Sequence, residues 1–330
     1  MAEFLTFDTD LTAVANAIRV KGGTSAQLIY PSGFVSAIQA IQTGITPKLV
    51  VTTTPGAAIT ATPAEGFKVV KGTAGADGMC TLELPKAGTW HVTAMANSVS
   101  NSQHIVIGTQ NMLLPLYHDT FANNTWEEII TVCRTGIAPD SWAVGDSKTM
   151  NIGGTAYQVD IIGKNHDEYA DGSGTAPLTF QLHDCYSEAK QMYSTNLSGL
   201  GWKNTDMRLA YLPAILALMP AEVQNGIRAV NKKTSEGGNS TTIEMVSDTL
   251  FLLSEVEIFG TASSSVAGEG SQYDYYKAGN PKIKKREGVD EFWWERSSAS
   301  GGMFCRVRAN GQAGASNASN SLGVSFAFCF

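Results

Sequence analysis

The sequence is poor in charged residues, and more of them are acidic than basic. Charged residues make up 16% of the 330 residues, and the formal net charge is −7. A sequence-independent nucleic-acid binder needs a basic face to neutralise phosphates, and an anionic membrane surface attracts basic segments. We therefore expect neither a nucleic acid nor a membrane surface as the partner.

Long apolar runs are also missing. No stretch approaches the roughly 18 apolar residues that a membrane-spanning helix needs. The start, MAEFLTFDTD, has neither the basic nor the apolar region of a secretory signal peptide. We expect synthesis in a cytoplasm, with no signal peptide and no membrane insertion.

Cysteines are few, odd in number and widely spaced: Cys80, Cys133, Cys185, Cys305 and Cys329. No C-x-x-C pair occurs, which argues against a zinc knuckle and a thioredoxin-type motif. We expect buried free thiols. We leave open whether Cys305 and Cys329 form a disulfide, because the two could lie on adjacent strands.

The short motifs of common catalytic sites are absent as well. The sequence contains no G-x-S-x-G nucleophile elbow, no phosphate-binding G-x-x-x-x-G-K and no H-E-x-x-H. We therefore expect a protein that is not an enzyme.

What remains is a glycine-rich, 43% hydrophobic chain that is long enough for two or three domains. We predict a multidomain protein with three parts: a short α-helical module (residues 1–44), an all-β sandwich (residues 45–110) and an α+β domain (residues 111–330).

Residues 1–44 read as a helical hairpin. One apolar stripe, Leu11, Val14, Ala15 and Ile18, ends before a glycine pair, and a second helix follows Pro31. Two such short helices cannot form a stable domain alone, so they must pack on something else. The segment is similar to an N-terminal attachment module of prophage structural proteins. The alternative is a helical cap on the next domain.

Residues 45–110 consist of brief alternating runs that are separated by turn signals such as Pro55-Gly56 and residues 75–78. Short strands at this spacing predict a β-sandwich. The segment resembles immunoglobulin-like spacer domains, and we expect His91 and His104 to be ordinary sheet side chains.

The third part shows both helix and strand signals. Thr125 and Glu128 form a capping-box pattern that predicts a helix ending at Gly136. Gly153-Gly154 lies between two alternating runs and predicts a hairpin. We expect further helices near residues 187–192, 205–218 and 222–230.

The last segment, residues 293–330, opens with Trp293-Trp294 and contains an Asn310-Gly311 hairpin signal. A loop rich in small residues is expected at 313–321. The chain then ends in an alternating run that should place Val324, Phe326, Phe328 and Phe330 on one buried face.

Several stretches carry a resemblance to a known family. They are Trp142–Asp146, Val159–Asp167, Leu178–Gln181, Gly201-Trp202 with Arg208, Asp248–Ser254 with Glu257, Trp-Trp-x-Arg-Ser from 293 to 297, and Gly323 to Phe328. From Tyr117 to Phe330 the chain resembles C-type-lectin-like domains. The branch in question is shared by formylglycine-generating-enzyme-like proteins, phage tropism determinants and a phage and bacterial surface domain of uncharacterised function. Trp293 and Trp294 are too large and too close to the core strand for ligand platforms, and we expect Trp294 and Arg296 to be buried scaffold.

The resemblance also implies a binding loop, because tropism determinants carry their receptor-contacting positions in the corresponding stretch. The candidate ligand-binding residues are Arg308, Asn310, Gln312, Ser316, Asn317 and Asn320. Small polar side chains of this kind, mounted between strands, supply adaptable hydrogen bonds. The alternative is a crossover loop that binds nothing.

Two further clusters of charged residues each allow two interpretations. Asp167 and Asp171 are weak candidates for a calcium site, although their spacing is not that of an EF-hand, and a structural loop is the alternative. The basic run of Lys277, Lys282 and residues 284–286 could bind an acidic glycan, or it could be a solvated loop.

These observations lead to one functional expectation. We expect a non-enzymatic phage virion protein, of the tail-fibre, baseplate or head-decoration type, located in the virion. Residues 1–44 would contact other virion proteins, and the C-terminal domain would bind a bacterial surface glycan or protein. We expect a homo-oligomer, a trimer by analogy with fibres. The alternatives are a purely structural virion component and a formylglycine-generating-type enzyme.

Overall fold

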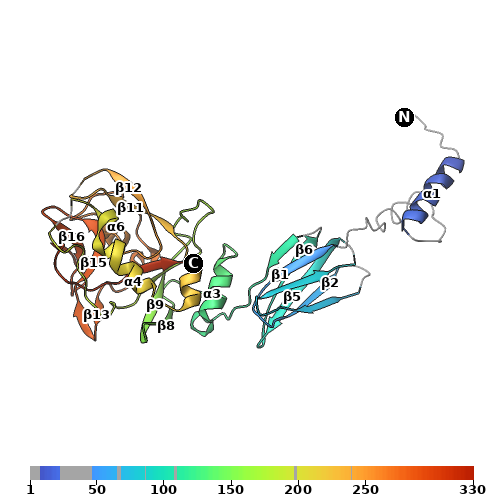
Figure 1. The fold of residues 1–330 in the computed structure, drawn as a ribbon, viewed down its shortest axis with the longest axis horizontal. Coiled ribbons are helices and arrows are strands. Elements are labelled where there is room, and N and C mark those ends of the chain that lie inside the picture. Colours follow the sequence, from blue (N-terminus) through green and yellow to red (C-terminus); the bar gives the residue numbers. More distant parts are fainter. Residues whose placement is uncertain are drawn as a thin grey trace. The chain divides into compact units, whose positions relative to one another are not determined.

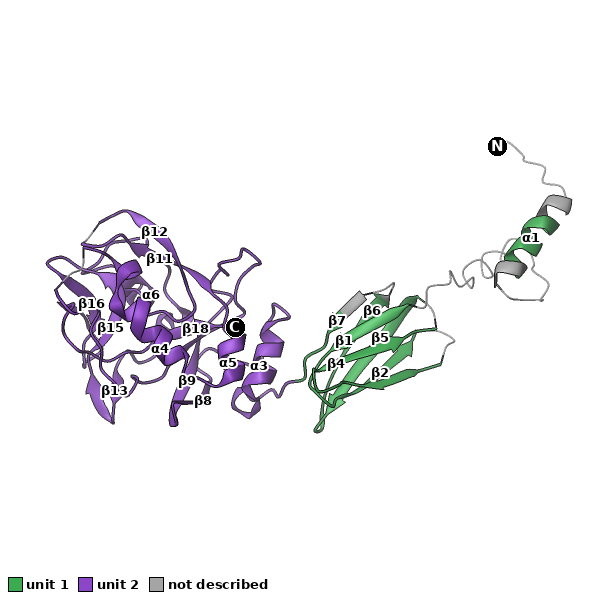
Figure 2. Cartoon of the chain, in the orientation of Figure 1, with its two compact units in different colours: residues 1–116 green, residues 117–330 purple. Residues whose placement is uncertain are grey.

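A computed structural model describes residues 8–22, 47–64, 68–85, 87–107, 110–196, 199–238 and 240–330. The chain forms two compact units, residues 1–116 and 117–330 (Figure 2). Strands prevail over helices in both, so the predicted β-rich multidomain class is confirmed at that level. In the described residues, no helix has the length and apolar character to cross a membrane.

The first predicted helix is present as α1 (Asp8–Gly22). Ala15 and Ile18 of the predicted apolar stripe are buried, whereas Val14 is exposed. The second predicted helix, after Pro31, lies outside the described residues.

After α1, the described residues of the first unit form two sheets (Figure 1). One has the order β4-β1-β7, from Met79–Glu83, Lys48–Thr52 and Gln110–Leu113. The other has the order β3-β2-β5-β6, from Val70–Thr73, Ala58–Pro63, Gly88–Ala96 and Val99–Ile107. Leu49 and Val51 from one sheet share an apolar core with Ile59 and Trp90 from the other. Alternating side chains bury one face of each sheet, as the sequence predicts for a sandwich.

Two details refine the sequence prediction for this unit. His91 and His104 are cross-strand partners of β5 and β6, and their rings stack at 4.4 Å. They are sheet side chains, as expected. Strand β7 pairs in parallel with β1, so the predicted boundary after residue 110 falls inside this sheet, and the unit runs on to Leu116.

The second unit is built on a sheet with the order β18-β10-β9-β8 and on smaller sheets beside it (Figure 1). The strands of the main sheet are β8 (Ser147–Ile152), β9 (Thr155–Lys164), β10 (Leu178–Leu182) and β18 (Ala327–Cys329). The smaller sheets are β11 (Val230–Ser235) with β12 (Ile243–Asp248), β13 (Lys284–Arg286) with β14 (Val289–Glu291), and β15 (Trp293–Ser298), β16 (Met303–Val307) and β17 (Ala313–Asn317) in that order. Short helices complete the unit: η1 (Phe121–Asn123), α3 (Trp126–Cys133), η2 (Trp202–Asn204), η3 (Met207–Tyr211), α4 (Leu212–Leu216), α5 (Ala221–Gly226), α6 (Glu255–Phe259) and α7 (Asp274–Lys277).

Local signals in the sequence placed several of these elements correctly. Helix α3 begins at the predicted capping box, where the Thr125 side chain accepts from the Glu128 amide and Glu128 accepts from the Thr125 amide. Gly153 and Gly154 form the turn between β8 and β9, both with positive φ. Residues 187–192 were expected to be helical, but they form irregular structure that pairs with the end of the chain through a bridge between Lys190 and Leu322.

The end of the chain passes through the core of the second unit. Strand β18 pairs with β10, and Ala327 also pairs with Phe251, so the last seven residues are all buried. The prediction of one buried face was therefore incomplete, because both faces are covered. Phe328 and Phe330 pack on Phe180 with ring centroids 5.3 Å away. Each buried phenylalanine contributes about 1.5–3 kcal/mol.

The five cysteines are free and buried in the structure. Cys305 lies on β16 and Cys329 on β18, and these strands belong to different sheets. The expectation that the two could be strand neighbours was wrong, and no disulfide joins them.

Candidate functional site

The hairpin between β16 and β17 carries most of the predicted binding residues. Its strands pair from Met303 with Asn317 to Val307 with Ala313. The predicted Asn310-Gly311 turn is present, with Gly311 at a φ of 82° and the Arg308 amide donating to the Gln312 carbonyl at 2.7 Å. Most of the loop expected at 313–321 is therefore an edge strand rather than a loop.

The six candidates are not all available to a ligand. Arg308, Asn310, Gln312, Asn317 and Asn320 are exposed. Ser316 is buried, because its strand partner is Phe304, whose ring is packed in the core. Ser316 was therefore a wrong choice as a surface contact.

The exposed candidates also fall into two groups. Arg308, Asn310 and Gln312 lie at the turn, where the Asn310 amide nitrogen donates to the Gln312 side-chain oxygen at 3.2 Å. Asn317 lies at the far end of β17, and Asn320 follows it in a turn. Five residues of strand separate the groups by about 17 Å. The structure thus offers two small polar surfaces.

The candidate calcium ligands are engaged elsewhere. Asp167 is buried and bonded to Lys232 at 2.7 Å and to the hydroxyls of Tyr273 and Thr179 at 2.8 and 2.6 Å. Burial opposes ionisation of Asp167, but the nearby Lys232 and His166 and the hydrogen bonds from Lys232 and Thr179 lower its pKa to about 2. The carboxylate is therefore a partner for a lysine rather than a free ligand.

Asp171 lies at the surface. It accepts from Ser173, which is the main reason for a pKa of about 2, and it pairs with Arg228 at 2.7 Å. Among the described residues, no group of three or more His, Cys, Asp or Glu side chains is placed to hold a metal ion.

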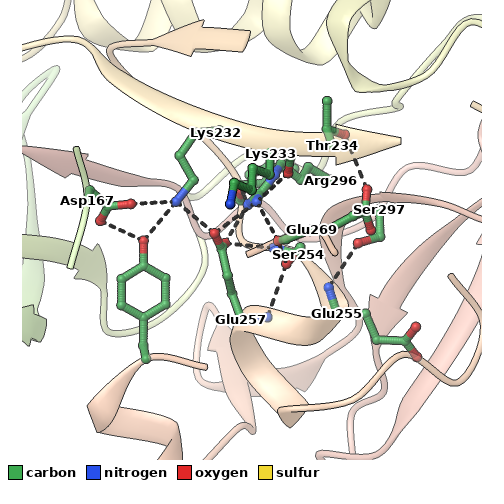
Figure 3. Close-up of polar contacts among 12 residues, drawn as sticks. Asp167, Lys232, Lys233, Thr234, Ser254, Glu255, Glu257, Glu269, Arg296 and Ser297 are labelled. Carbon is green, nitrogen blue, oxygen red and sulfur yellow. Dashed lines mark hydrogen bonds and ion pairs between the residues drawn. The ribbon is translucent and has the colours of Figure 1, made fainter. Parts of the chain in front are cut away.

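A network of buried charges lies inside the second unit (Figure 3). From Asp167 it continues through Lys232, whose Nζ lies 2.8 Å from a Glu257 oxygen, to Glu257 and Arg296. Arg296 also donates to the carbonyls of Leu252, Lys233 and Glu269, at 3.0, 2.9 and 3.0 Å. The network joins β11, α6 and β15, so it fixes the sheet that carries the hairpin. The negative charges of Asp167 and Glu257 are thus matched by the positive charges of Lys232 and Arg296.

Sequence reasoning identified Arg296 as buried scaffold, and this is confirmed. It missed Lys232 as its partner in the network. For Glu257 the sequence did contain a usable signal. The Ser254-x-x-Glu257 spacing is that of a capping box, and these residues form one at the start of α6. Glu257 thus serves the helix and the ion pairs together.

A second group of acidic side chains forms no ion pair within the described residues. Glu255 accepts hydrogen bonds from the backbone and hydroxyls of Ser263 and Ser265. Glu295 is fully buried, and neither of its carboxylate oxygens has a hydrogen-bond partner within the described residues. Burial, followed by the nearby Glu255 and Glu269, raises the pKa of Glu295 well above its ordinary value. Glu295 is therefore held as a neutral acid.

The cysteines of the second unit are placed for packing. Burial raises the pKa of the Cys305 and Cys329 thiols well above the ordinary value, and neighbouring carboxylates add to it. A thiol in such surroundings stays protonated and is a poor nucleophile.

The basic run is only partly solvated. Lys284 is buried and donates to the carbonyls of Leu182 and His183 at 2.6 and 2.7 Å, and burial lowers its pKa to about 8. Arg286 pairs with Glu291 across the β13–β14 hairpin at 2.8 Å. These two side chains stabilise structure and do not form a continuous basic surface.

The fold and the site together describe a β-rich unit that presents a polar hairpin on a buried ionic framework. Within it, residues 179–330 match the model of a domain of unknown function, DUF6273. The matched segment includes Lys232, Glu257, Arg296 and the hairpin. No curated protein and no solved structure matches the chain.

Proposed function

We propose that the protein is a non-enzymatic phage virion protein of the tail-fibre, baseplate or head-decoration type. Its second unit binds a glycan or protein of the bacterial surface through the β16–β17 hairpin. Residues 1–44 attach it to other virion proteins, and the chain assembles as a homo-oligomer, by analogy a trimer. The phage assignment rests on the resemblance to tropism determinants and prophage modules.

One observation supports the binding role above all. The exposed polar side chains Arg308, Asn310 and Gln312 project from a hairpin whose neighbouring strand, β15, is wholly buried. Functional side chains are commonly mounted on such rigid supports. The alternative, a structural virion component without receptor binding, shares the framework but assigns no role to this surface. The buried, protonated thiols count against a formylglycine-generating-type enzyme.

The test is binding of the labelled full-length protein to a panel of intact bacterial strains. Two double variants separate the two surfaces: Asn310→Ala with Gln312→Ala, and Asn317→Ala with Asn320→Ala. Asn225→Ala, at an exposed position on α5, is the control. We expect strain-selective binding that the turn variant abolishes and the control retains, with unchanged far-UV circular dichroism.

The opposite result is also informative. If no strain binds the wild-type protein while it still associates with phage particles through residues 1–44, the receptor-binding role is wrong. The structural alternative would then be the better account.

A further inference from the structure

Arg306, on β16, and Arg308, which directly follows the last residue of β16, form a pair of neighbouring guanidinium groups. They are two residues apart, so their side chains leave the strand on the same side. Across the ladder, Arg306 faces Gly314, and the Arg308 amide bonds the Gln312 carbonyl. Arg308 is exposed and Arg306 is half-buried, with its guanidinium carbon 4.2 Å from the ring centre of Phe292.

Both side chains lie across β17 and reach its outer edge. Arg308 Nε donates to the Ala313 carbonyl at 3.2 Å, and Arg306 Nε donates to the Ala315 carbonyl at 3.1 Å. Gly314 makes this possible, because a Cβ there would lie 2.8 Å from Arg308 Nε. Residues 313 and 315 are two positions apart on one strand, so the guanidiniums are spaced by about 7 Å.

Neither guanidinium has a carboxylate partner among the described residues. Four other arginines of this unit, Arg208, Arg228, Arg286 and Arg296, each pair with an acid. The terminal nitrogens of Arg306 and Arg308 bond no described atom, so their donors remain for a ligand. In a chain of net charge −7, two adjacent uncompensated cations form a local positive site.

We propose that Arg306 and Arg308 form a binding site for an acidic glycan with carboxylate or phosphate groups about 7 Å apart. The amides of Asn310 and Gln312 beside them supply hydrogen bonds to sugar hydroxyls. This site deepens the proposed function, on which its biological role rests, by naming the chemistry of the ligand and adding Arg306.

An acidic peptide strand fits the same surface less well. Strand β17 is the edge of its sheet, where a peptide would normally add by pairing with the outward carbonyls. Here the carbonyls of Ala313 and Ala315 already accept from the two arginines. The arginines thus block strand addition while leaving their terminal nitrogens available, which favours a glycan.

The test measures binding of full-length protein to three probes by isothermal titration calorimetry at 50 and 500 mM NaCl. The probes are tri-galacturonate (carboxylate), a glycerol-phosphate oligomer (phosphate) and maltotriose (neutral). We expect one acidic probe to bind, more weakly at high salt, and maltotriose not to bind. The preferred probe separates a carboxylate from a phosphate source.

Three variants make the test specific. Arg308→Gln should weaken binding about tenfold or more, the effect of losing a charge-assisted hydrogen bond. Gly314→Ala keeps the charge but displaces Arg308, and it should weaken binding too. Arg134→Gln, an equal charge change at the exposed end of α3, should bind as wild type. Thermal melting checks that each variant is folded.

The site is refuted if no acidic probe binds more tightly than maltotriose, or if Arg308→Gln and Arg134→Gln behave alike. A fourth titration uses penta-glutamate as an acidic peptide under the same conditions, and equal binding of it would overturn the glycan assignment. If the protein binds cells and Arg308→Gln does not change this binding, the proposed function is supported but this glycan site is wrong. If an acidic probe binds through Arg308 but no cells are bound, the glycan site is supported and the proposed function is wrong.

Discussion

Replacing Arg296 by methionine tests whether the buried charge network holds the second unit together. The change removes two bonds to Glu257 and the donors to the carbonyls of Leu252, Lys233 and Glu269. Lys232 then faces both Asp167 and Glu257 alone. Breaking a buried ion pair by removing one partner costs about 3–5 kcal/mol. The Glu269 carbonyl still accepts from the Ser254 hydroxyl at 2.7 Å, whereas the carbonyls of Leu252 and Lys233 lose the Arg296 donor. We therefore expect a loss of about 5 kcal/mol, a large share of the 5–15 kcal/mol typical of whole domains.

The measurement is urea unfolding followed by tryptophan fluorescence. Five of the six tryptophans lie in the second unit, and only Trp90 lies in the first, so the signal reports mainly on the second. Lys203→Met breaks an exposed pair with Glu244 and serves as the control, with an expected loss below about 1 kcal/mol. A loss in Arg296→Met as small as in the control would refute the reasoning. Arg296→Met with Glu257→Leu should regain part of the loss, because the carboxylate that loses Arg296 is then removed as well.

Three further predictions follow from individual groups. Because the folded state raises the pKa of Glu295, its stabilising contribution is full below the unfolded value of about 4.5 and is lost as pH rises through the folded value. The melting temperature should therefore fall from pH 5 to pH 9, and it should fall less in Glu295→Gln; an equal fall in both would contradict this. Thr125→Ala removes the cap of α3 and should cost about 1 kcal/mol in urea unfolding, against almost nothing for Thr131→Ser on the same helix. The buried thiols should resist Ellman's reagent in the native protein and all five should react in urea; rapid native reaction of Cys305 or Cys329 would show that they are accessible.

Local signals predicted the elements whose geometry is set by neighbours in sequence. The Thr125–Glu128 box, the Gly153-Gly154 turn and the Asn310-Gly311 turn each depend on a few adjacent residues, and each is present in the structure. The prediction of a helix at 187–192 was wrong because the structure of this segment depends on a distant part of the chain. Its backbone pairs with a partner more than a hundred residues away, at Leu322, and no local pattern carries that information.

The candidate site likewise has features that the sequence reveals and features that depend on the fold. The polar character of residues 308–320 was visible in the sequence, and so was the buried role of Arg296. That Ser316 points into the core depends on its register with Phe304. That Arg306 belongs beside Arg308 depends on Gly314 lying opposite them. Register across strands is set by the whole sheet, so composition alone could not select among these residues.

The β-rich, multidomain organisation, the main turns and caps, and the low overall charge could be predicted from the sequence, because they follow from local propensity and composition. Which charges are buried and which remain unpaired depends on how distant segments pack in the fold. Asp167, Lys232, Glu257 and Arg296 come from distant segments and meet only when β11, α6 and β15 pack together. From the sequence alone, every aspartate and glutamate side chain is simply an acid. Whether it becomes a lysine's partner like Asp167 or a neutral buried acid like Glu295 depends on which side chains the fold brings within a few ångströms.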